Sequence, residues 1–150
     1  MTLFMKIVAQ NRRARFDYEI VETLEAGMML TGPEVKSCRE GHVSLTGAYV
    51  LLQKGKAVLR NVTIARYRYA AGTQTNEPDR ERELLLKKTE FHHLASATDQ
   101  KGMTIVPLEI HAGKYIKIVI GLGRGKKQFD KRSSIKKRDV ERKLREGREI

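Results

Sequence analysis

Residues 103–122, MTIVPLEIHAGKYIKIVIGL, show the pattern of two β-strands. Apolar residues dominate its first half, and in its second half isoleucine recurs at every second position from 116 to 120. That period is typical of a β-strand with one buried face. Gly113 separates the two halves and suits a turn. We therefore predict two strands, over 103–112 and 114–122, that pair with each other.

Earlier segments extend this pattern. From Tyr18 to Ala26 apolar and charged side chains fall on opposite faces of a strand, which Gly27 is expected to end. Ser44 to Gln53 and Ala57 to Tyr67 are rich in Val, Leu, Ile, Thr and Tyr, which favour strands. Lys54-Gly55-Lys56 lies between them and has the length of a compact turn. The two runs therefore predict a long hairpin.

A short helix is predicted over Glu34 to Glu40. Thr31 is a suitable N-cap, and Gly41 suits the position after the last turn. Val35 and Cys38 lie three positions apart on this helix and are expected to face the core. Cys38 is the only cysteine, which excludes an internal disulfide and a zinc site built from several thiolates. We predict a buried thiol rather than a nucleophile.

The middle of the chain combines a loop and a second helix. Gly, Thr, Asn, Pro and charged residues fill 70–83 and predict an exposed loop, after which the leucines of 84–86 return to the core. Thr89 is a candidate N-cap for the second helix, on which Phe91 and Leu94 begin an apolar stripe. Several strands, two short helices and no repeated βαβ unit predict a mainly β fold, an antiparallel β-barrel of oligonucleotide-binding type. An open α+β sheet is the alternative.

Positive charge is concentrated toward the end of the sequence. The chain holds 30 Lys and Arg against 18 Asp and Glu, a net charge of +12. Residues 124–150 contain 12 of these cations and 5 of these acids, so they supply +7. We predict a barrel domain over 1–123, with an N-terminal arm over 1–17, and a basic C-terminal tail over 124–150. The tail is expected to be disordered alone and to become helical against RNA.

The composition favours nucleic acid as the partner, because a strongly basic surface attracts polyanions. No apolar run approaches the ~18–20 residues of a membrane-spanning helix, and residues 1–8 lack the features of a secretory signal, so a cytoplasmic location is expected. The four histidines lack the spacing of paired metal ligands. Gly121 to Lys126 fails the spacing of a phosphate-binding loop and is expected to be a flexible exit from the last strand. No catalytic residue, cofactor or metal is predicted.

Several motifs occur together over nearly the whole chain. They are Asn11-Arg12-Arg13-Ala14-Arg15 before Tyr18, Glu25-Ala26-Gly27, Gly32-Pro33-Glu34-Val35-Lys36-Ser37, Arg82-Glu83-Leu84-Leu85-Leu86, Gly125-Lys126-Lys127-Gln128-Phe129-Asp130-Lys131-Arg132 and Ile135-Lys136-Lys137-Arg138. In this order they resemble the SsrA-binding protein (small protein B) family, the partner of transfer-messenger RNA in bacterial ribosome rescue.

The resemblance implies a barrel that binds the tRNA-like domain of transfer-messenger RNA and delivers it to stalled ribosomes for trans-translation. It also implies a tail that is helical on the ribosome and occupies the empty mRNA path near the decoding centre of the small subunit. The residues that it assigns to RNA binding are Asn11, Arg13, Glu25, Lys36, Arg39 and Leu85. The residues that it assigns to ribosome binding are Lys126, Lys127, Phe129, Asp130, Lys131, Arg132, Lys136, Lys137 and Arg138. We expect a monomer when free, and binding rather than catalysis; a generic ribosomal or initiation-factor-like RNA-binding protein is the alternative.

The chemistry of these side chains is compatible with RNA binding. Lys36 and Arg39 share one face of the predicted helix and can hold phosphates, and Asn11 can hydrogen-bond to a base or a sugar. Glu25 is repelled by phosphate, so it is expected to accept from a base amino group or to orient a neighbouring arginine. Leu85 either contacts RNA or lies in the barrel core.

Overall fold

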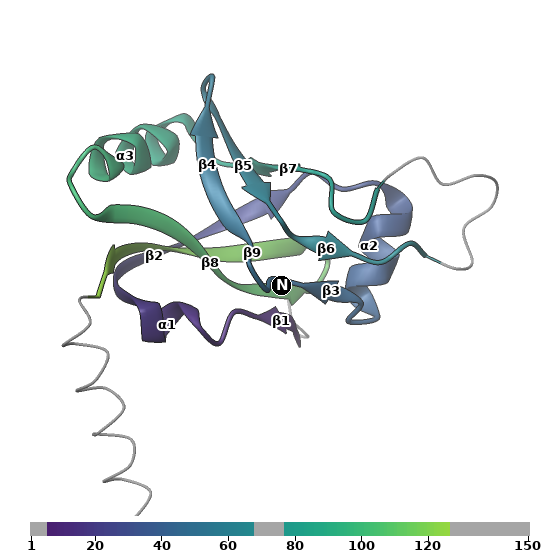
Figure 1. Cartoon of the computed structure of the whole chain (residues 1–150). Coiled ribbons are helices and arrows are strands. Elements are labelled where there is room, and N and C mark those ends of the chain that lie inside the picture. The colour runs from purple at the N-terminus through teal and green to yellow at the C-terminus, as the bar shows by residue number, and fades with distance from the viewer. Residues whose placement is uncertain (1–5, 68–76, 127–150) are drawn as a thin grey trace, which may run out of the picture.

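The structure is a computed structural model, which describes residues 6–67 and 77–126 (Figure 1). In chain order its elements are β1 (Lys6–Gln10), α1 (Ala14–Asp17), β2 (Tyr18–Met28), α2 (Gly32–Arg39), β3 (Val43–Ser44), β4 (Tyr49–Gln53), β5 (Lys56–Arg60), β6 (Thr63–Ile64), β7 (Arg82–Leu85), α3 (Lys88–Thr98), β8 (Met103–Ala112) and β9 (Ile116–Gly125). Among these described residues, no helix is long and apolar enough to cross a membrane.

The strands form a curled antiparallel sheet. Its order is β1-β8-β9-β2-β7-β5-β4, and β3 pairs with β6 beside it. Bulges in β2, between Ile20 and Glu22, and in β8, between Pro107 and Glu109, bend the two long strands. The sheet curls until β4 lies against β8 and β1 lies against β3 (Figure 1). This nearly closed arrangement confirms the predicted mainly β barrel of oligonucleotide-binding type over the open sheet.

Residues 103–122 form most of the central hairpin. β8 and β9 pair over almost their whole length, as predicted. Ile110, Ile118 and Ile120 are completely or almost completely buried inside the barrel. Each such side chain contributes about 1.5–3 kcal/mol by leaving water. The period-2 isoleucines therefore fix which face of β9 is the core face.

A second apolar cluster lies on the outer face of the central hairpin, where α1 covers β8. It consists of Ala14, Val106 and Leu108, with Tyr18, Ile20 and Val119 packed against them. Gly121 and Gly123 make room for this cluster, because a Cβ on either glycine would lie 3.0–3.1 Å from a side-chain atom of Leu108 or Tyr18. The prediction that Gly121 to Lys126 is a flexible exit is therefore wrong for residues up to Gly125, which belong to β9.

Residues 6–10, which were predicted to belong to an arm, form a strand of the sheet. β1 pairs with β8, and α1 continues from it into β2. Gly27 does not end β2, which continues to Met28. Instead Leu85 of β7 packs over Gly27, since a Cβ there would lie 3.4 Å from the Leu85 side chain. The missing side chain at position 27 thus serves cross-strand packing, which a single strand pattern does not reveal.

The predicted long hairpin is interrupted on both sides. Positive φ angles at Gly47 (76°) and Asn61 (60°) turn the chain between β3 and β4 and after β5. β4 and β5 do pair as predicted, across a turn in which Lys54 and Gly55 both have positive φ. That geometry is typical of a type I′ hairpin turn.

The second predicted helix begins one residue before its expected cap. α3 starts at Lys88, and the backbone N–H of Lys87 donates to Oε1 of Glu90 at 2.9 Å. Thr89 is therefore not the N-cap, because Glu90 reaches back to the residue before the helix. Leu94 is buried as predicted, whereas Phe91 is only half-buried.

Candidate RNA-binding surface

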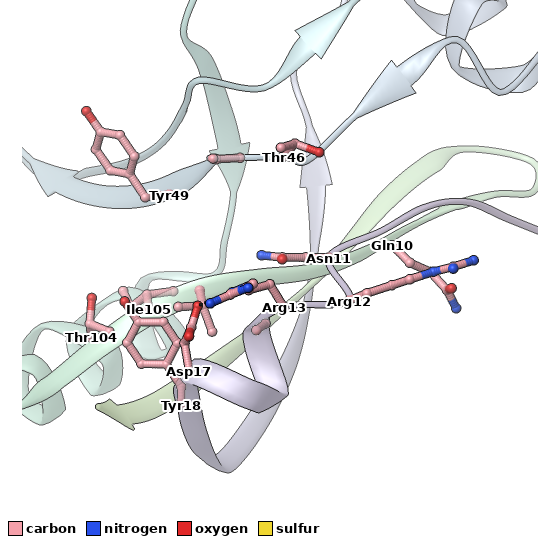
Figure 2. Close-up of a pocket in the computed structure, with 14 residues that line it drawn as sticks. Gln10, Asn11, Arg12, Arg13, Asp17, Tyr18, Thr46, Tyr49, Thr104 and Ile105 are labelled. Atoms are coloured by element: carbon pink, nitrogen blue, oxygen red, sulfur yellow. Dashed lines mark ion pairs between the residues drawn. The ribbon is translucent and has the colours of Figure 1, made fainter. Parts of the chain in front are cut away.

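The first candidate site is a cleft between the N-terminal segment and the turn before β4. It has a volume of about 590 Å³, and Asn11 and Arg13 line it (Figure 2). Thr46 and Tyr49 lie across the cleft from them. The lining residues are Gln10, Asn11, Arg12, Arg13, Ala14, Asp17, Tyr18, Thr46, Gly47, Ala48, Tyr49, Thr104, Ile105 and Val106.

Asn11 joins the chain to the bulge of β8 through two hydrogen bonds. Its Nδ2 donates to the carbonyl oxygen of Pro107 at 2.9 Å, and its backbone N–H donates to the carbonyl oxygen of Leu108 at 2.8 Å. The side chain thus shapes the cleft wall by holding β1 and α1 on the sheet. This role was not predicted, and any contact of Asn11 with RNA adds to it.

The cleft combines cations with aromatic rings. Arg13 is 74% exposed in its side chain and lies 3.5 Å from the carboxylate of Asp17. Its guanidinium lies 5.0 Å from the centre of the Phe16 ring. Tyr49 is 39% exposed on the opposite wall. An exposed guanidinium and an exposed phenol ring are the groups that proteins use for phosphates and for stacked bases.

The second candidate site is the outer face of α2 with the β8–β9 turn. Arg39 donates from its guanidinium to the carbonyl oxygens of Gly113, at 2.6 Å, and Lys114, at 3.0 Å. Lys36 is exposed, and its Nζ lies 5.4 Å from the centre of the Tyr67 ring. Lys36 and Arg39 therefore share a surface, as predicted, but Arg39 also has a structural role in tying the helix to the turn.

The third group lies on the outer face of the sheet. Glu25 of β2 pairs with Lys117 of β9, with 3.0 Å between Oε1 and Nζ. Leu85 is 50% exposed, whereas the neighbouring Leu84 is buried. The alternative of a core position for Leu85 is therefore wrong, because β7 turns this side chain outward. Lys117, not an arginine, is the cation beside Glu25, and no sequence motif marked it.

A buried ion-pair network holds α2 in place. Arg82 is completely buried and donates from Nε to Oε2 of Glu34 at 3.0 Å, and Arg80 also donates to this carboxylate. The Arg82 guanidinium also donates to the carbonyl oxygens of Val62, Pro78 and others. Arg82 was predicted to lie in an exposed loop; it starts β7 instead, and its charge is offset by these buried acceptors.

The electrostatics of α2 follow from this network. Burial raises the pKa of Glu34, but hydrogen bonds from the Thr31 backbone and from Arg82 and Arg80 outweigh it, so the pKa lies below the ordinary value of 4.5. Thr31 caps the helix as predicted, because its hydroxyl accepts from the Glu34 N–H. Burial, with Glu34 nearby, raises the pKa of Cys38 to about 12. The Cys38 side chain is completely buried, which confirms the predicted buried thiol.

The predicted ribosome-binding residues are almost all beyond the described part of the chain. Lys126 directly follows β9, and its backbone N–H donates to the carbonyl oxygen of Asp17 at 3.0 Å. Lys127, Phe129, Asp130, Lys131, Arg132, Lys136, Lys137 and Arg138 lie outside the described residues. Their predicted role stays a prediction.

Comparison with known proteins identifies the family. The family model described as SmpB protein matches residues 8–149. An SsrA-binding protein of Coprothermobacter proteolyticus is 47% identical over 143 residues, which are 94% of this chain and 95% of that protein. An SsrA-binding protein of Leuconostoc mesenteroides is 49% identical over 139 residues, 91% of this chain and 89% of that protein.

A solved structure has the same fold. It is described as "tmRNA-SmpB: a journey to the center of the bacterial ribosome", and its matching chain superposes with a TM-score of 0.64 and 46% identity. The match covers 79% of this chain and 84% of that chain. The resemblance carried by the sequence motifs is thereby confirmed, and the chain belongs to the SmpB protein family.

Proposed function

We propose that the chain binds the tRNA-like domain of transfer-messenger RNA and delivers it to stalled ribosomes for trans-translation. The observation that carries this proposal is the family match, which runs from residue 8 to residue 149 and leaves no room for an unrelated domain within that range. The similar solved chain comes from work on tmRNA, SmpB and the bacterial ribosome.

The geometry supports RNA binding at more than one place on the barrel. The cleft offers Arg13 and Tyr49, and the face of α2 offers Lys36. We propose that phosphates bind at the cations and that an unstacked base lies against Tyr49. Glu25 and Leu85 complete the set on the outer face, where the Glu25 carboxylate orients Lys117.

The basic end of the chain is proposed to act on the ribosome. Residues 124–150 supply +7 of the net charge of +12. We propose that the part of this segment that follows β9 forms a tail separate from the barrel domain and becomes helical in the empty mRNA path near the decoding centre. The residues that bind the ribosome would be the lysines and arginines from Lys126 to Arg138, together with Phe129 and Asp130.

We also propose that the protein acts in the cytoplasm, by binding and without catalysis. The family is one of RNA-binding proteins. In the described ranges 6–67 and 77–126, no three His, Cys, Asp or Glu side chains are grouped to hold a metal ion. The buried carboxylate of Glu34 accepts hydrogen bonds from arginine side chains and from a backbone N–H, so it is not available as a proton acceptor for a substrate.

The test is a titration of the full chain with the tRNA-like domain near 0.15 M salt, with excess ordinary tRNA as competitor. At that salt concentration purely charge-driven binding is strongly weakened. Binding that survives the competitor supports the proposal. Complete displacement by ordinary tRNA would favour a generic ribosomal or initiation-factor-like RNA-binding protein.

A further inference from the structure

The described part of the chain ends beside the cleft that contains Asn11. Lys126 is the last described residue, and its backbone N–H donates to the carbonyl oxygen of Asp17 at 3.0 Å. Asp17 and its neighbour Tyr18 both line the cleft (Figure 2). The end of β9 lies next to α1, which belongs to the same wall (Figure 1). The chain therefore leaves the described region at the wall of this cleft.

The cleft offers a binding site for an aromatic ring. Its volume of about 590 Å³ lies within the ~300–1,000 Å³ range of ligand-binding pockets. Ala14, Ala48 and Ile105 supply apolar surface, and Tyr18 and Tyr49 supply two phenol rings. Tyr49 stays 39% exposed, although an aromatic side chain gains from leaving water and from edge-to-face contact with a second ring. The exposed surface of Tyr49 is therefore available to a ring that enters the cleft.

The next residues of the chain, 127–130, bring such a ring within reach of the cleft. Phe129 is the only aromatic residue after Tyr115 in the sequence, and it comes three residues after Lys126. Three residues of chain span at most about 10 Å, and the backbone of Lys126 already hydrogen-bonds to a residue of the cleft wall. A phenylalanine ring gains free energy by leaving water, whereas its sequence neighbours are polar or charged. Phe129 is therefore the residue best placed to enter the cleft from this end of the chain.

The charges of the cleft and of this segment also fit. Arg12 and Arg13 line the cleft and are exposed. The Arg13 side chain stays 74% exposed although its Nε lies 3.5 Å from the Asp17 carboxylate. Guanidinium groups favour carboxylate partners, to which they can donate two parallel hydrogen bonds. Asp130 directly follows Phe129 and is the first acidic residue after β9. A Phe129 ring in the cleft would thus bring this carboxylate to the exposed arginines.

We propose that, in the free protein, residues 127–130 of the same chain fold back into this cleft. The Phe129 ring lies against Tyr49, and the Asp130 carboxylate pairs with the cleft arginines. The contact is autoinhibitory, because it covers groups that the proposed function assigns to RNA. RNA that enters the cleft displaces the segment and frees the start of the tail for the ribosome. The inference rests on the proposed function for RNA as the competitor, whereas the docking itself requires no RNA.

The contact couples the barrel to the tail. RNA and residues 127–130 cannot occupy the cleft together, so each lowers the apparent affinity of the other by the same factor. The apparent Kd for RNA rises as the undocked fraction of the chain falls. A segment that is docked about half of the time would roughly double this Kd and roughly halve the access of solvent to the Phe129 ring.

Fluorescence of the full chain tests the docking without RNA. The sequence contains no tryptophan, so Phe129→Trp introduces a single indole at the proposed contact. Leu144→Trp is the matched control, because it places an indole further along the same basic segment. The indole at position 129 is expected to emit at a shorter wavelength and to be quenched by acrylamide about twofold or more weakly than the control. Equal emission and equal quenching of the two variants would overturn the proposal.

A second substitution tests whether the ring lies in the cleft. Tyr49→Ala in the Phe129→Trp chain removes the opposite wall and is expected to raise the quenching to the level of the Leu144→Trp control. Tyr49→Phe keeps a ring on that wall and should keep the protection. Tyr115→Ala is the matched control, because Tyr115 is a 64% exposed tyrosine outside the cleft lining, and it should also leave the protection unchanged. Thermal unfolding checks that each variant remains folded.

Two results of this comparison would contradict the assignment. Protection that survives Tyr49→Ala would show that the ring binds elsewhere on the molecule. Protection that disappears on dilution of the protein would show that the segment binds a second copy of the chain rather than its own cleft.

Addition of RNA tests the competition. The tRNA-like domain is expected to raise acrylamide quenching of the Phe129→Trp chain to the level of the Leu144→Trp chain, because RNA displaces the ring. In a titration with the same RNA, Phe129→Ala should lower the apparent Kd by about twofold or more, whereas Leu144→Ala should leave it unchanged. Protection that persists at saturating RNA would overturn the autoinhibition.

Failure of the docking and failure of the proposed function give different results. RNA binding by a chain whose position 129 is as accessible as position 144 would overturn the docking and leave the proposed function intact. A protected position 129 in a chain that does not bind the tRNA-like domain would overturn the proposed function and leave the docking intact.

Discussion

Arg82 and Glu34 form a buried ion pair in which two guanidinium nitrogens, Nε and Nη2, donate to the same carboxylate oxygen at 3.0 and 2.5 Å. Arg82 starts β7 and Glu34 lies in the first turn of α2, so the pair joins elements 48 residues apart in the sequence. Because α2 presents Lys36 and Arg39 at the surface, this pair positions the candidate phosphate contacts without touching RNA itself.

Breaking this pair is expected to destabilise the fold strongly. Arg82→Met leaves the Glu34 carboxylate buried without its main partner, and such losses cost about 3–5 kcal/mol. Urea unfolding of the variant measures the change in the free energy of unfolding. Arg66→Met is the matched control, since Arg66 forms an exposed pair with Glu77 and should cost ~1 kcal/mol or less. Equal effects of the two substitutions would contradict the structural role of the buried pair.

The same carboxylate predicts a pH dependence of stability. The folded-state pKa of Glu34 lies below its ordinary value of 4.5, because hydrogen bonds from Thr31, Arg82 and Arg80 outweigh the effect of burial. Its contribution to stability is therefore complete above about pH 4.5 and is lost as the pH falls through the lowered folded pKa. Glu34→Gln should remove this part of the acid dependence of urea unfolding. An unchanged acid limb would show that Glu34 does not titrate with folding.

Gly121 should resist substitution because of packing rather than backbone conformation. A Cβ there would lie 3.0 Å from Leu108 and 3.1 Å from Ile20, so Gly121→Ala is expected to destabilise the barrel by about 1 kcal/mol. Gly125→Ala is the control in the same strand, because nothing lies within 4 Å of its added Cβ. Thermal unfolding compares the two. Equal melting temperatures would show that the outer cluster adapts to the extra methyl group.

Lys36 is predicted to contact one phosphate of the tRNA-like domain. Lys36→Ala should weaken binding and reduce the slope of log affinity against log salt by about 0.7–0.9. Arg39→Ala should have a compound effect, because Arg39 also hydrogen-bonds the β8–β9 turn. Titrations at several salt concentrations provide the slopes. A wild-type slope for Lys36→Ala would place this side chain off the interface.

Local patterns predicted the regular elements well. The isoleucines of β9 fixed its core face, and Thr31 marked the N-cap of α2, which begins at Gly32 rather than at the predicted Glu34. Failures arose where a residue's role depends on a distant partner. The sequence around Arg82 is typical of a loop, and the buried position of Arg82 is evident only from its ion pair with Glu34. Gly27 has the pattern of a strand break, and its role is evident only from the packing of Leu85 over it.

The sequence predicted individual residues of the candidate site but not their arrangement in space. Motifs selected Asn11, Arg13 and Lys36, and all three line the cleft or lie exposed on α2. Tyr49 and Lys117 were missed, because each stands in an ordinary strand pattern. Only the curl of the sheet brings Tyr49 across from Arg13, and only the pairing of β2 with β9 brings Lys117 to Glu25.

The most direct test of the proposed function is transfer of the nascent peptide onto alanine-charged transfer-messenger RNA on ribosomes stalled by an mRNA without a stop codon. We predict that transfer requires the full chain and is almost lost when residues from 127 onward are deleted, although the truncated chain still binds the tRNA-like domain. This truncation keeps β9 and the hydrogen bond from Lys126 to Asp17. Transfer that proceeds equally without the chain would contradict the proposed function, and equal loss of RNA binding and transfer on truncation would contradict the separation of barrel and tail.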